Sequence, residues 1–303
     1  MASEFYEFTR GELSFEGETR PVFRKGQGPA VILLHEVPGL HPGVFRLADV
    51  LCEAGLTVFL PSLFGEPGRP FTAGYVATSM VRACVMREFA VFSRSKTSPV
   101  TSWLACLARH AHRECGGEGV GVIGMCITGG FALALMIEPS VIAPVLCNPS
   151  LPFALTPSRK RDLGVDAETL ERAKARSEAG KICVLGLRFS GDIAVPHERF
   201  QRLREEFGEN FQAIEIDSRP GNSHGIRVFA HSVLGADHVE RPGHPTLDAE
   251  RRTIAFLCER LIGHSGLEQK ELPRASRCAD VLSQMNNEIP REEVSCSSNE
   301  SES

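Results

Sequence analysis

One cysteine of this chain lies where a predicted buried strand runs directly into a predicted apolar helix. Residues 120–130 read VGVIGMCITGG, so small residues surround Cys126. A nucleophile in such an elbow occupies a strained turn, and the helix N-terminus points its N–H groups at the reacting atom. A thiolate is favoured there, and the same N–H groups can stabilise the oxyanion formed by attack on a carbonyl. We therefore predict that Cys126 is a nucleophile; the alternative is a buried structural cysteine.

A thiol nucleophile needs a base that takes its proton and a carboxylate that orients the base. Asp192 comes just after the predicted strand at 181–189, at the edge where open sheets carry their sites. It could otherwise be an ordinary turn or helix-capping residue. Three histidines follow the next predicted strand, namely His224, His231 and His238. His224 comes soonest after that strand, in the turn PGNSHG, and is the predicted base, with the other two as alternatives.

A further carboxylate follows the first predicted buried strand, in the segment HEVPG at 35–39. A carboxylate near the thiol could accept its proton, or hold the thiol unreactive until substrate binds. Glu36 is the candidate for this role, although it could also be a solvated loop residue. His35 is expected to be structural.

Four motifs in this order resemble the dienelactone hydrolase family: HEVPGL, GMCITGGFALAL, FSGD and PGNSHG. The resemblance covers residues from about 5 to 263. It implies an α/β-hydrolase fold and the hydrolysis of a small ester or lactone, in which a cysteine forms a thioester with the acyl group. It implies no metal and no organic cofactor.

The resemblance assigns roles to four side chains and two backbone N–H groups. The side chains are Cys126 as nucleophile, Asp192 as the residue that orients the base, His224 as base and Glu36 as resting partner of the thiol. The N–H groups are those of Val37 and Ile127, which would bind the oxyanion.

Two departures from the family's pattern bear on geometry and substrate. Thr128 stands where the family's elbow usually has a glycine, so that a hydroxyl and a branched side chain occupy a tight position. The family's dienelactone enzymes also bind a substrate carboxylate through arginines. The candidates in this chain lie in no matching motif; they are Arg82, Arg87, Arg94 and Arg227.

The segments between these motifs alternate between buried strands and amphipathic helices. Residues 5–25 predict two antiparallel strands at a sheet edge. Apolar runs predict further strands at 30–34, 56–60, 119–124, 143–146, 181–189 and 211–217, and helical spacing predicts helices at 44–54, 100–112, 129–137, 196–207 and 247–262. The predicted fold class is α/β, with a mostly parallel sheet and helices on both of its faces.

Composition limits the domain organisation and the partners. Residues 1–263 are predicted to form one catalytic domain, and the polar residues 264–303 a disordered tail. A net charge of -5 without a basic face argues against nucleic acid and anionic membranes, and no apolar run is long enough to span a bilayer. The N-terminus lacks a signal-peptide pattern and the ten cysteines form no CxxC pair, so we expect a cytoplasmic protein without disulfides or metal.

The leading functional hypothesis is a hydrolase of small esters or lactones. One alternative is a catalytically silent protein of the same fold that binds a small ligand or partner through the same cleft. Another is acyl transfer to an acceptor other than water. The sequence leaves the substrate and the oligomeric state open.

Overall fold

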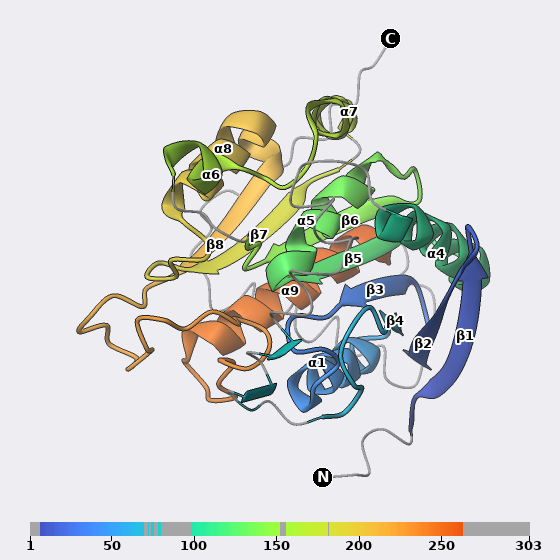
Figure 1. Ribbon diagram of the computed structural model, residues 1–303, viewed down its shortest axis with the longest axis horizontal. Coiled ribbons are helices and arrows are strands. Elements are labelled where there is room, and N and C mark those ends of the chain that lie inside the picture. Colours follow the sequence, from blue (N-terminus) through green and yellow to red (C-terminus); the bar gives the residue numbers. More distant parts are fainter. Residues whose placement is uncertain are drawn as a thin grey trace.

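Eight strands form one sheet in the order β1-β2-β4-β3-β5-β6-β7-β8 (Figure 1). The computed structural model describes residues 7–69, 72, 74, 75, 78, 79, 99–151, 156–180 and 182–262. The predicted tail at 264–303 and three of the candidate arginines, Arg82, Arg87 and Arg94, lie outside the described residues.

The sheet is antiparallel at its N-terminal edge and parallel elsewhere. Its strands are β1 Thr9–Phe15, β2 Glu18–Gly26, β3 Ala30–Leu34, β4 Thr57–Pro61, β5 Val120–Met125, β6 Val141–Cys147, β7 Val184–Phe189 and β8 Phe211–Ile216. β1 pairs antiparallel with β2 and β2 with β4, whereas every pair from β4 to β8 is parallel. All residues of β3, β4 and β5 are buried, because helices cover both faces of the sheet. The predicted α/β-hydrolase architecture is confirmed.

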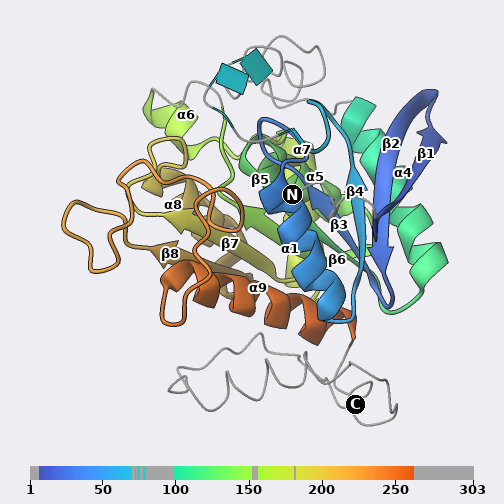
Figure 2. The same ribbon diagram turned by 90° about the horizontal axis from the view of Figure 1, so that it is seen from below.

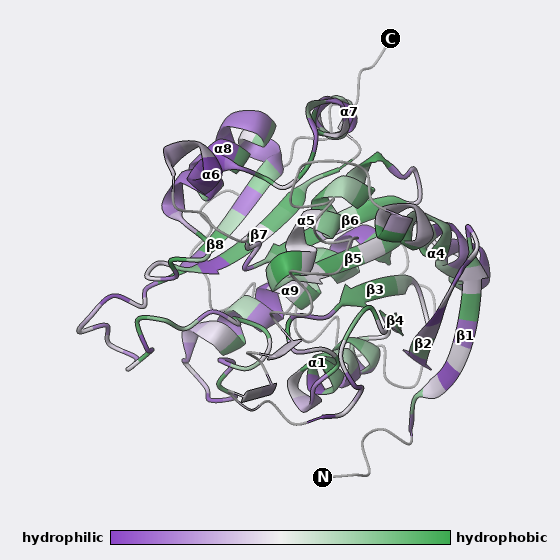
Figure 3. Ribbon diagram, in the orientation of Figure 1, coloured by the Kyte–Doolittle hydropathy of each residue, from purple (hydrophilic) through white to green (hydrophobic). Residues whose placement is uncertain are grey.

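Helices pack against both faces of the sheet. The helices of the described ranges are α1 Pro42–Glu53, α4 Pro99–Cys115, α5 Gly129–Ala134, α6 Pro157–Arg161, α7 Ala167–Glu178, α8 His197–Phe207 and α9 Pro245–Leu261. One core cluster contains Phe45 of α1 and Leu257 of α9, and the other contains Trp103 of α4, Phe131 of α5 and Phe200 of α8. In the view of Figure 2, α1 and α9 lie in front of the sheet. The apolar residues gather on the central strands, as Figure 3 shows.

The helix expected at 129–137 is shorter than the apolar pattern suggests. α5 ends at Ala134, and 3₁₀ turns flank it at Cys126–Thr128 and Leu135–Ile137. Glu138 then has an extended backbone, with φ −77° and ψ 121°. The following residue, Pro139, disfavours a helical conformation at Glu138 and so ends the helical stretch.

The carboxyl ends of the parallel strands meet along one edge of the sheet, and the chain carries polar residues there. Glu36 follows β3, Cys126 follows β5 and Ser150 follows β6. Asp192 follows β7, and the long segment 217–244 follows β8. The topology therefore brings together residues that are far apart in the sequence.

The described cysteines differ in their bonding. Five are free, namely Cys52, Cys106, Cys115, Cys126 and Cys147. Cys183 and Cys258 are disulfide-bonded, so the expectation of a chain without disulfides is wrong for these two. An apolar sequence context predicts that a thiol is buried, but it does not determine whether another sulfur lies within bonding distance. Within the described ranges, no helix has the length and apolar character needed to cross a bilayer.

Candidate active site

The backbone turns sharply at Cys126. This residue directly follows β5 and has a positive φ of 57°. Such a conformation is strained for a residue with a side chain, and it presents the sulfur at the carboxyl edge of the sheet. Gly124 makes the turn possible, since a Cβ atom at this position would lie only 2.4 Å from the carbonyl oxygen of Thr128.

Thr128 shows how the elbow tolerates a residue larger than glycine. Its side chain is fully buried, and its hydroxyl accepts a hydrogen bond from the Met125 N–H at 2.8 Å. The same hydroxyl lies 3.0 Å from the carbonyl oxygen of Leu34 at the end of β3. The Thr128 hydroxyl therefore joins the elbow to the neighbouring strand and leaves no unpaired polar group there.

His231 and Asp192 form a short hydrogen bond beside the elbow. The two atoms, His231 Nδ1 and Asp192 Oδ2, are 2.6 Å apart, and the Asp192 side chain is only 5% exposed. The other carboxylate oxygen of Asp192 accepts the Ala194 N–H at 2.9 Å. Because the carboxylate accepts at Nδ1, the second ring nitrogen of His231 is left for the sulfur of Cys126, which is close enough to influence the pKa of the same imidazole.

Charge around His231 favours its protonated form. Burial alone would favour the neutral imidazole, but the Cys126 sulfur and the hydrogen-bonded Asp192 carboxylate together raise the pKa of His231 well above its usual value. A protonated imidazole between a sulfur and a carboxylate is the arrangement expected of an imidazolium–thiolate pair.

The Cys126 sulfur has a second polar neighbour, which is not among the residues predicted from the sequence. Its distance to the Ser150 hydroxyl oxygen is 3.1 Å, and the Ser150 N–H donates to the Cys126 carbonyl at 3.1 Å. The sequence does carry a signal for Ser150, because it is a polar residue just beyond a buried parallel strand, as Asp192 is.

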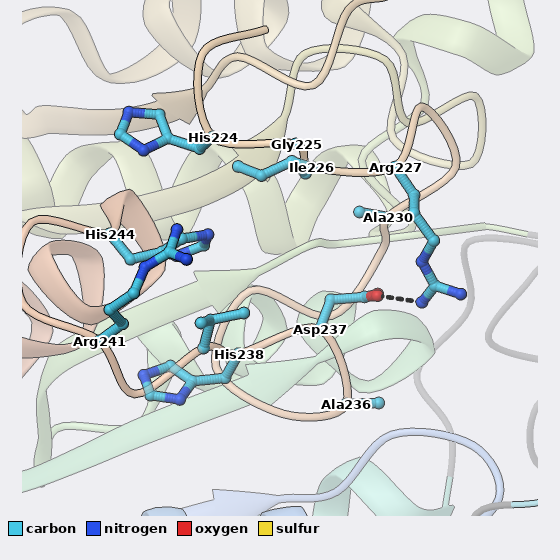
Figure 4. A pocket seen from close by; sticks show the side chains of 11 residues that line it. His224, Gly225, Ile226, Arg227, Ala230, Ala236, Asp237, His238, Arg241 and His244 are labelled. Carbon is cyan, nitrogen blue, oxygen red and sulfur yellow. Dashed lines mark hydrogen bonds and ion pairs between the residues drawn. The ribbon is translucent and has the colours of Figure 1, made fainter.

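The structure does not bring His224, the predicted base, to Cys126. His224 is exposed, and its ring packs edge-on against His244, with centroids 5.7 Å apart. Both line a pocket of about 280 Å³ next to the one that contains Cys126 (Figure 4). The assignment of His224 is therefore corrected in favour of His231. His224 was chosen because it comes soonest after the strand. The segment after β8, however, places His224 in the neighbouring pocket and brings the later His231 to Asp192 and Cys126.

His238, the other alternative, is held away from the thiol. Its Nε2 lies 3.4 Å from a carboxylate oxygen of Glu250, and its side chain is 2% exposed. Burial and the nearby Arg46 charge lower the pKa of His238 to about 4, so it is neutral at pH 7.

Glu36 is buried, but its hydrogen bonds go to residues other than Cys126. One oxygen, Oε1, accepts from the Ser232 hydroxyl at 2.6 Å and from His41 Nε2 at 3.0 Å. His41 Nδ1 accepts the Gly43 N–H, so the ring proton lies on Nε2. Ser232 follows His231 directly, and Glu36 thereby fixes the backbone that carries the imidazole. A Cβ atom at Gly235 would lie 2.4 Å from Oε1, so this position has no room for a side chain.

His35 is a neutral structural residue. It is fully buried, and its Nδ1 donates to the Glu36 carbonyl while its Nε2 accepts the Leu63 N–H at 3.0 Å. Burial lowers the pKa of His35 to about 4, which keeps the ring uncharged.

Cys126, Ser150, Asp192 and His231 open into one cavity of about 590 Å³. This volume lies in the range of small-molecule sites, roughly 300–1,000 Å³. Val37 lines the cavity and Ile127 is buried directly after the nucleophile position. Within the described ranges, no three His, Cys, Asp or Glu side chains are arranged to hold a metal ion.

Arg227, the remaining arginine candidate, lies at the rim of this cavity. Its guanidinium contacts the Asp237 carboxylate at 2.5 Å, an ion pair drawn as a dashed line in Figure 4. Asp237 also accepts the N–H groups of His231 and Ser232, at 2.8 and 3.1 Å. The pair therefore helps to hold the His231 segment in place.

Most of the chain matches one known protein family. Residues 19–239 match the model of the dienelactone hydrolase family. The chain belongs to the dienelactone hydrolase family. The four motifs at the elbow and strand ends thus predicted the family correctly. No curated protein matches the chain.

Solved dienelactone hydrolases share the fold at low sequence identity. A putative dienelactone hydrolase from Klebsiella pneumoniae superposes with a TM-score of 0.56 and 19% identity, over 83% of this chain and 99% of that one. The dienelactone hydrolase from Anabaena variabilis has a TM-score of 0.52 and 16% identity, over 84% and 99%. A dienelactone hydrolase-like promiscuous phosphotriesterase from metagenomic libraries has a TM-score of 0.52 and 19% identity, over 83% and 95%. Family membership supports a hydrolase, and these solved structures share the fold of the chain.

Proposed function

We propose that this chain is a cysteine-dependent hydrolase of small esters or lactones. The observation that carries the proposal is the meeting of Cys126, His231 and Asp192 at one cavity, with a short His231–Asp192 hydrogen bond and a raised pKa of His231. The expectations of a cytoplasmic location, of no cofactor and of one catalytic domain at 1–263 remain predictions from the sequence.

Acylation begins with attack of the Cys126 sulfur on the ester carbonyl carbon. A C–S bond forms, and the carbonyl oxygen becomes an oxyanion that accepts from the backbone N–H groups of Val37 and Ile127. The C–O bond to the alcohol then breaks, and the imidazolium of His231 gives its proton to the departing oxygen. The acyl group remains as a thioester on Cys126.

Deacylation returns the enzyme to its resting state. The neutral imidazole of His231 takes a proton from water while the water oxygen attacks the thioester carbonyl. The C–S bond breaks, the carboxylic acid leaves, and the thiolate regains its imidazolium partner. Asp192 orients the imidazole in both steps. Glu36 acts on the imidazole through Ser232, as a positioning residue for the His231 segment.

Trapping of the acyl-enzyme tests this proposal directly. Incubation with p-nitrophenyl butyrate and an acid quench are expected to leave one butyryl group, located on Cys126 by mass spectrometry of peptides. Neutral hydroxylamine should remove it, since this reagent cleaves thioesters readily. Cys147 is the internal control, because burial raises the pKa of its thiol and it should carry no label. A butyryl group on Ser150, or turnover without any adduct on Cys126, would contradict the proposal.

Ser150→Ala is expected to lower kcat/KM by roughly tenfold and to slow iodoacetamide alkylation of Cys126 at pH 7 by a similar factor. The Ser150 hydroxyl lies 3.1 Å from the sulfur, and a hydrogen bond to a charged group contributes about 1.5–3 kcal/mol. Ser140→Ala is the matched control, since Ser140 is equally buried but precedes β6 at the opposite end of the strand. Equal alkylation rates in the wild type and Ser150→Ala would exclude this role.

A further inference from the structure

Two large apolar side chains are exposed at the mouth of the Cys126 cavity. Ile193 is 89% exposed and Phe229 is 83% exposed, the two highest values among large apolar residues in the described ranges. Both line the same cavity as Cys126. Val228, which precedes Phe229, is 36% exposed and also lines it. An exposed apolar patch next to a nucleophile indicates contact with an apolar partner or ligand.

Each of these side chains lies at the tip of a tight turn, where the fold itself does not require an apolar residue. The Val195 N–H donates to the Asp192 carbonyl, which leaves Ile193 at a central position of the turn. The Ala230 N–H donates to the Arg227 carbonyl, which leaves Phe229 at a central position of the second turn. Gly, Asn, Asp, Ser and Pro predominate in turns, so these two apolar side chains are better accounted for by a ligand than by stability.

The two turns are fixed relative to each other and to the nucleophile. Asp192 begins the first turn and bonds His231, which lies two residues beyond Phe229. A Cβ atom at Gly191 would lie 2.8 Å from the Val228 carbonyl oxygen, so the two loops are in direct contact. The buried guanidinium of Arg199 donates to the Ala194 carbonyl at 3.0 Å and to the Pro149 carbonyl at 2.9 Å. These contacts hold Ile193 and Phe229 in fixed positions at the entrance of the cavity.

The charged residues that line the cavity already have partners within the protein. Arg227 pairs with Asp237, Asp192 bonds His231, and Glu36 accepts from Ser232 and His41. Among the described lining residues, no cation is left for an anionic substituent of the substrate. An uncharged, apolar group fits this surface better than a carboxylate.

The geometry points to a substrate class: uncharged esters whose alcohol portion is an extended apolar group that lies on Ile193 and Phe229. This inference rests on the proposed function. The departing alcohol oxygen takes its proton from His231, so the alcohol portion must lie on the side of the cavity that His231 occupies. That side is formed by the loops that carry the two apolar side chains, whereas the acyl group stays attached to Cys126.

Alkyl acetates of increasing alcohol length test the inference in the full chain, with turnover followed by pH-stat titration. Ethyl, butyl and octyl acetate release the same acid, so any difference reports on the alcohol portion. We expect kcat/KM to rise at least about tenfold from ethyl to octyl acetate, since each buried methylene can raise affinity up to about fourfold. In the double variant Ile193→Ser, Phe229→Ser the rise should fall below about threefold.

Matched controls show whether Ile193 and Phe229 cause the effect of alcohol length. Val239→Ser removes another exposed apolar side chain, 39% exposed, that lines only the neighbouring pocket, and it should behave as the wild type. A p-nitrophenyl acyl series, from acetate to octanoate, should respond to chain length equally in wild type and double variant. Unchanged thermal unfolding would show that the double variant folds normally.

Three results would overturn the inference. A flat profile across the alkyl acetates in the wild type, with turnover still lost after thiol alkylation, refutes it and leaves the proposed function intact. If the double variant loses the dependence on chain length only in the acyl series, Ile193 and Phe229 contact the acyl group instead of the alcohol portion. Conversion of a wild-type dimer into a monomer by the double variant, with unchanged alkyl preference, assigns the patch to self-association. Turnover that survives alkylation would instead refute the proposed function.

Discussion

Cys126→Ser is expected to lower kcat/KM for small esters by about 10³-fold or more, and Cys126→Ala to lower it at least as far. The site is arranged for a sulfur, because the imidazole beside it has a raised pKa and already holds its proton in the resting state. A serine hydroxyl at the same position is a far weaker acid than a thiol, so the same imidazole activates it poorly. Steady-state hydrolysis of p-nitrophenyl butyrate measures the loss.

Cys106→Ser is the matched control for the thiol variants. Cys106 is another free, partly exposed thiol and lies on α4, where it contacts the Arg109 side chain. Its replacement should leave kcat/KM within about twofold of the wild type. Wild-type turnover by Cys126→Ala, with its melting temperature unchanged, would exclude catalysis by this cysteine.

His231→Gln should lower kcat/KM by about 10³-fold or more, whereas His224→Gln should leave it within about twofold. The loss should appear mainly in kcat, because the imidazole acts on the reacting atoms. His224 lies in the neighbouring pocket against His244, so its removal touches neither the thiol nor Asp192. Inactivation by His224→Gln together with activity in His231→Gln would reverse the assignment made from the structure.

The pH dependence of acylation provides a second check on His231. Since the pKa of His231 is raised well above its usual value, its proton stays bound at neutral pH and is lost only as the solution becomes alkaline. Acylation needs that proton for the departing alcohol, so its rate should decline as the pH rises through the raised pKa of His231. Asp192→Asn removes a carboxylate that stabilises the imidazolium, so the alkaline decline should begin at a lower pH. An unmoved alkaline limb in Asp192→Asn would argue against this coupling.

The sequence by itself determined the architecture and the position of Cys126 at the end of β5. Uninterrupted apolar runs at β3, β4 and β5 are typical of strands buried on both faces. The helical spacing of apolar residues between such runs predicts connecting helices, and strands joined through helices form a parallel sheet. The small residues around Cys126 indicate a strand-to-helix elbow, and this indication does not depend on contacts with distant parts of the chain. Asp192 was predicted for a similar reason, as a carboxylate directly after a buried strand. Each of these features depends on residues that are neighbours in the sequence, so a local sequence pattern is enough to predict it.

Only the tertiary structure decided which histidine meets the thiol and what Glu36 contacts. The segment after β8 has no regular periodicity, so its course is set by contacts with distant residues, such as the hydrogen bond from Val233 N–H to the Asn148 side chain. His231 is brought to Cys126 by Asp192, 39 positions away, and Ser232 is brought to Glu36 across 196 positions. Spacing along the chain carries no information about such pairs, because their geometry depends on how the loops pack against the finished sheet.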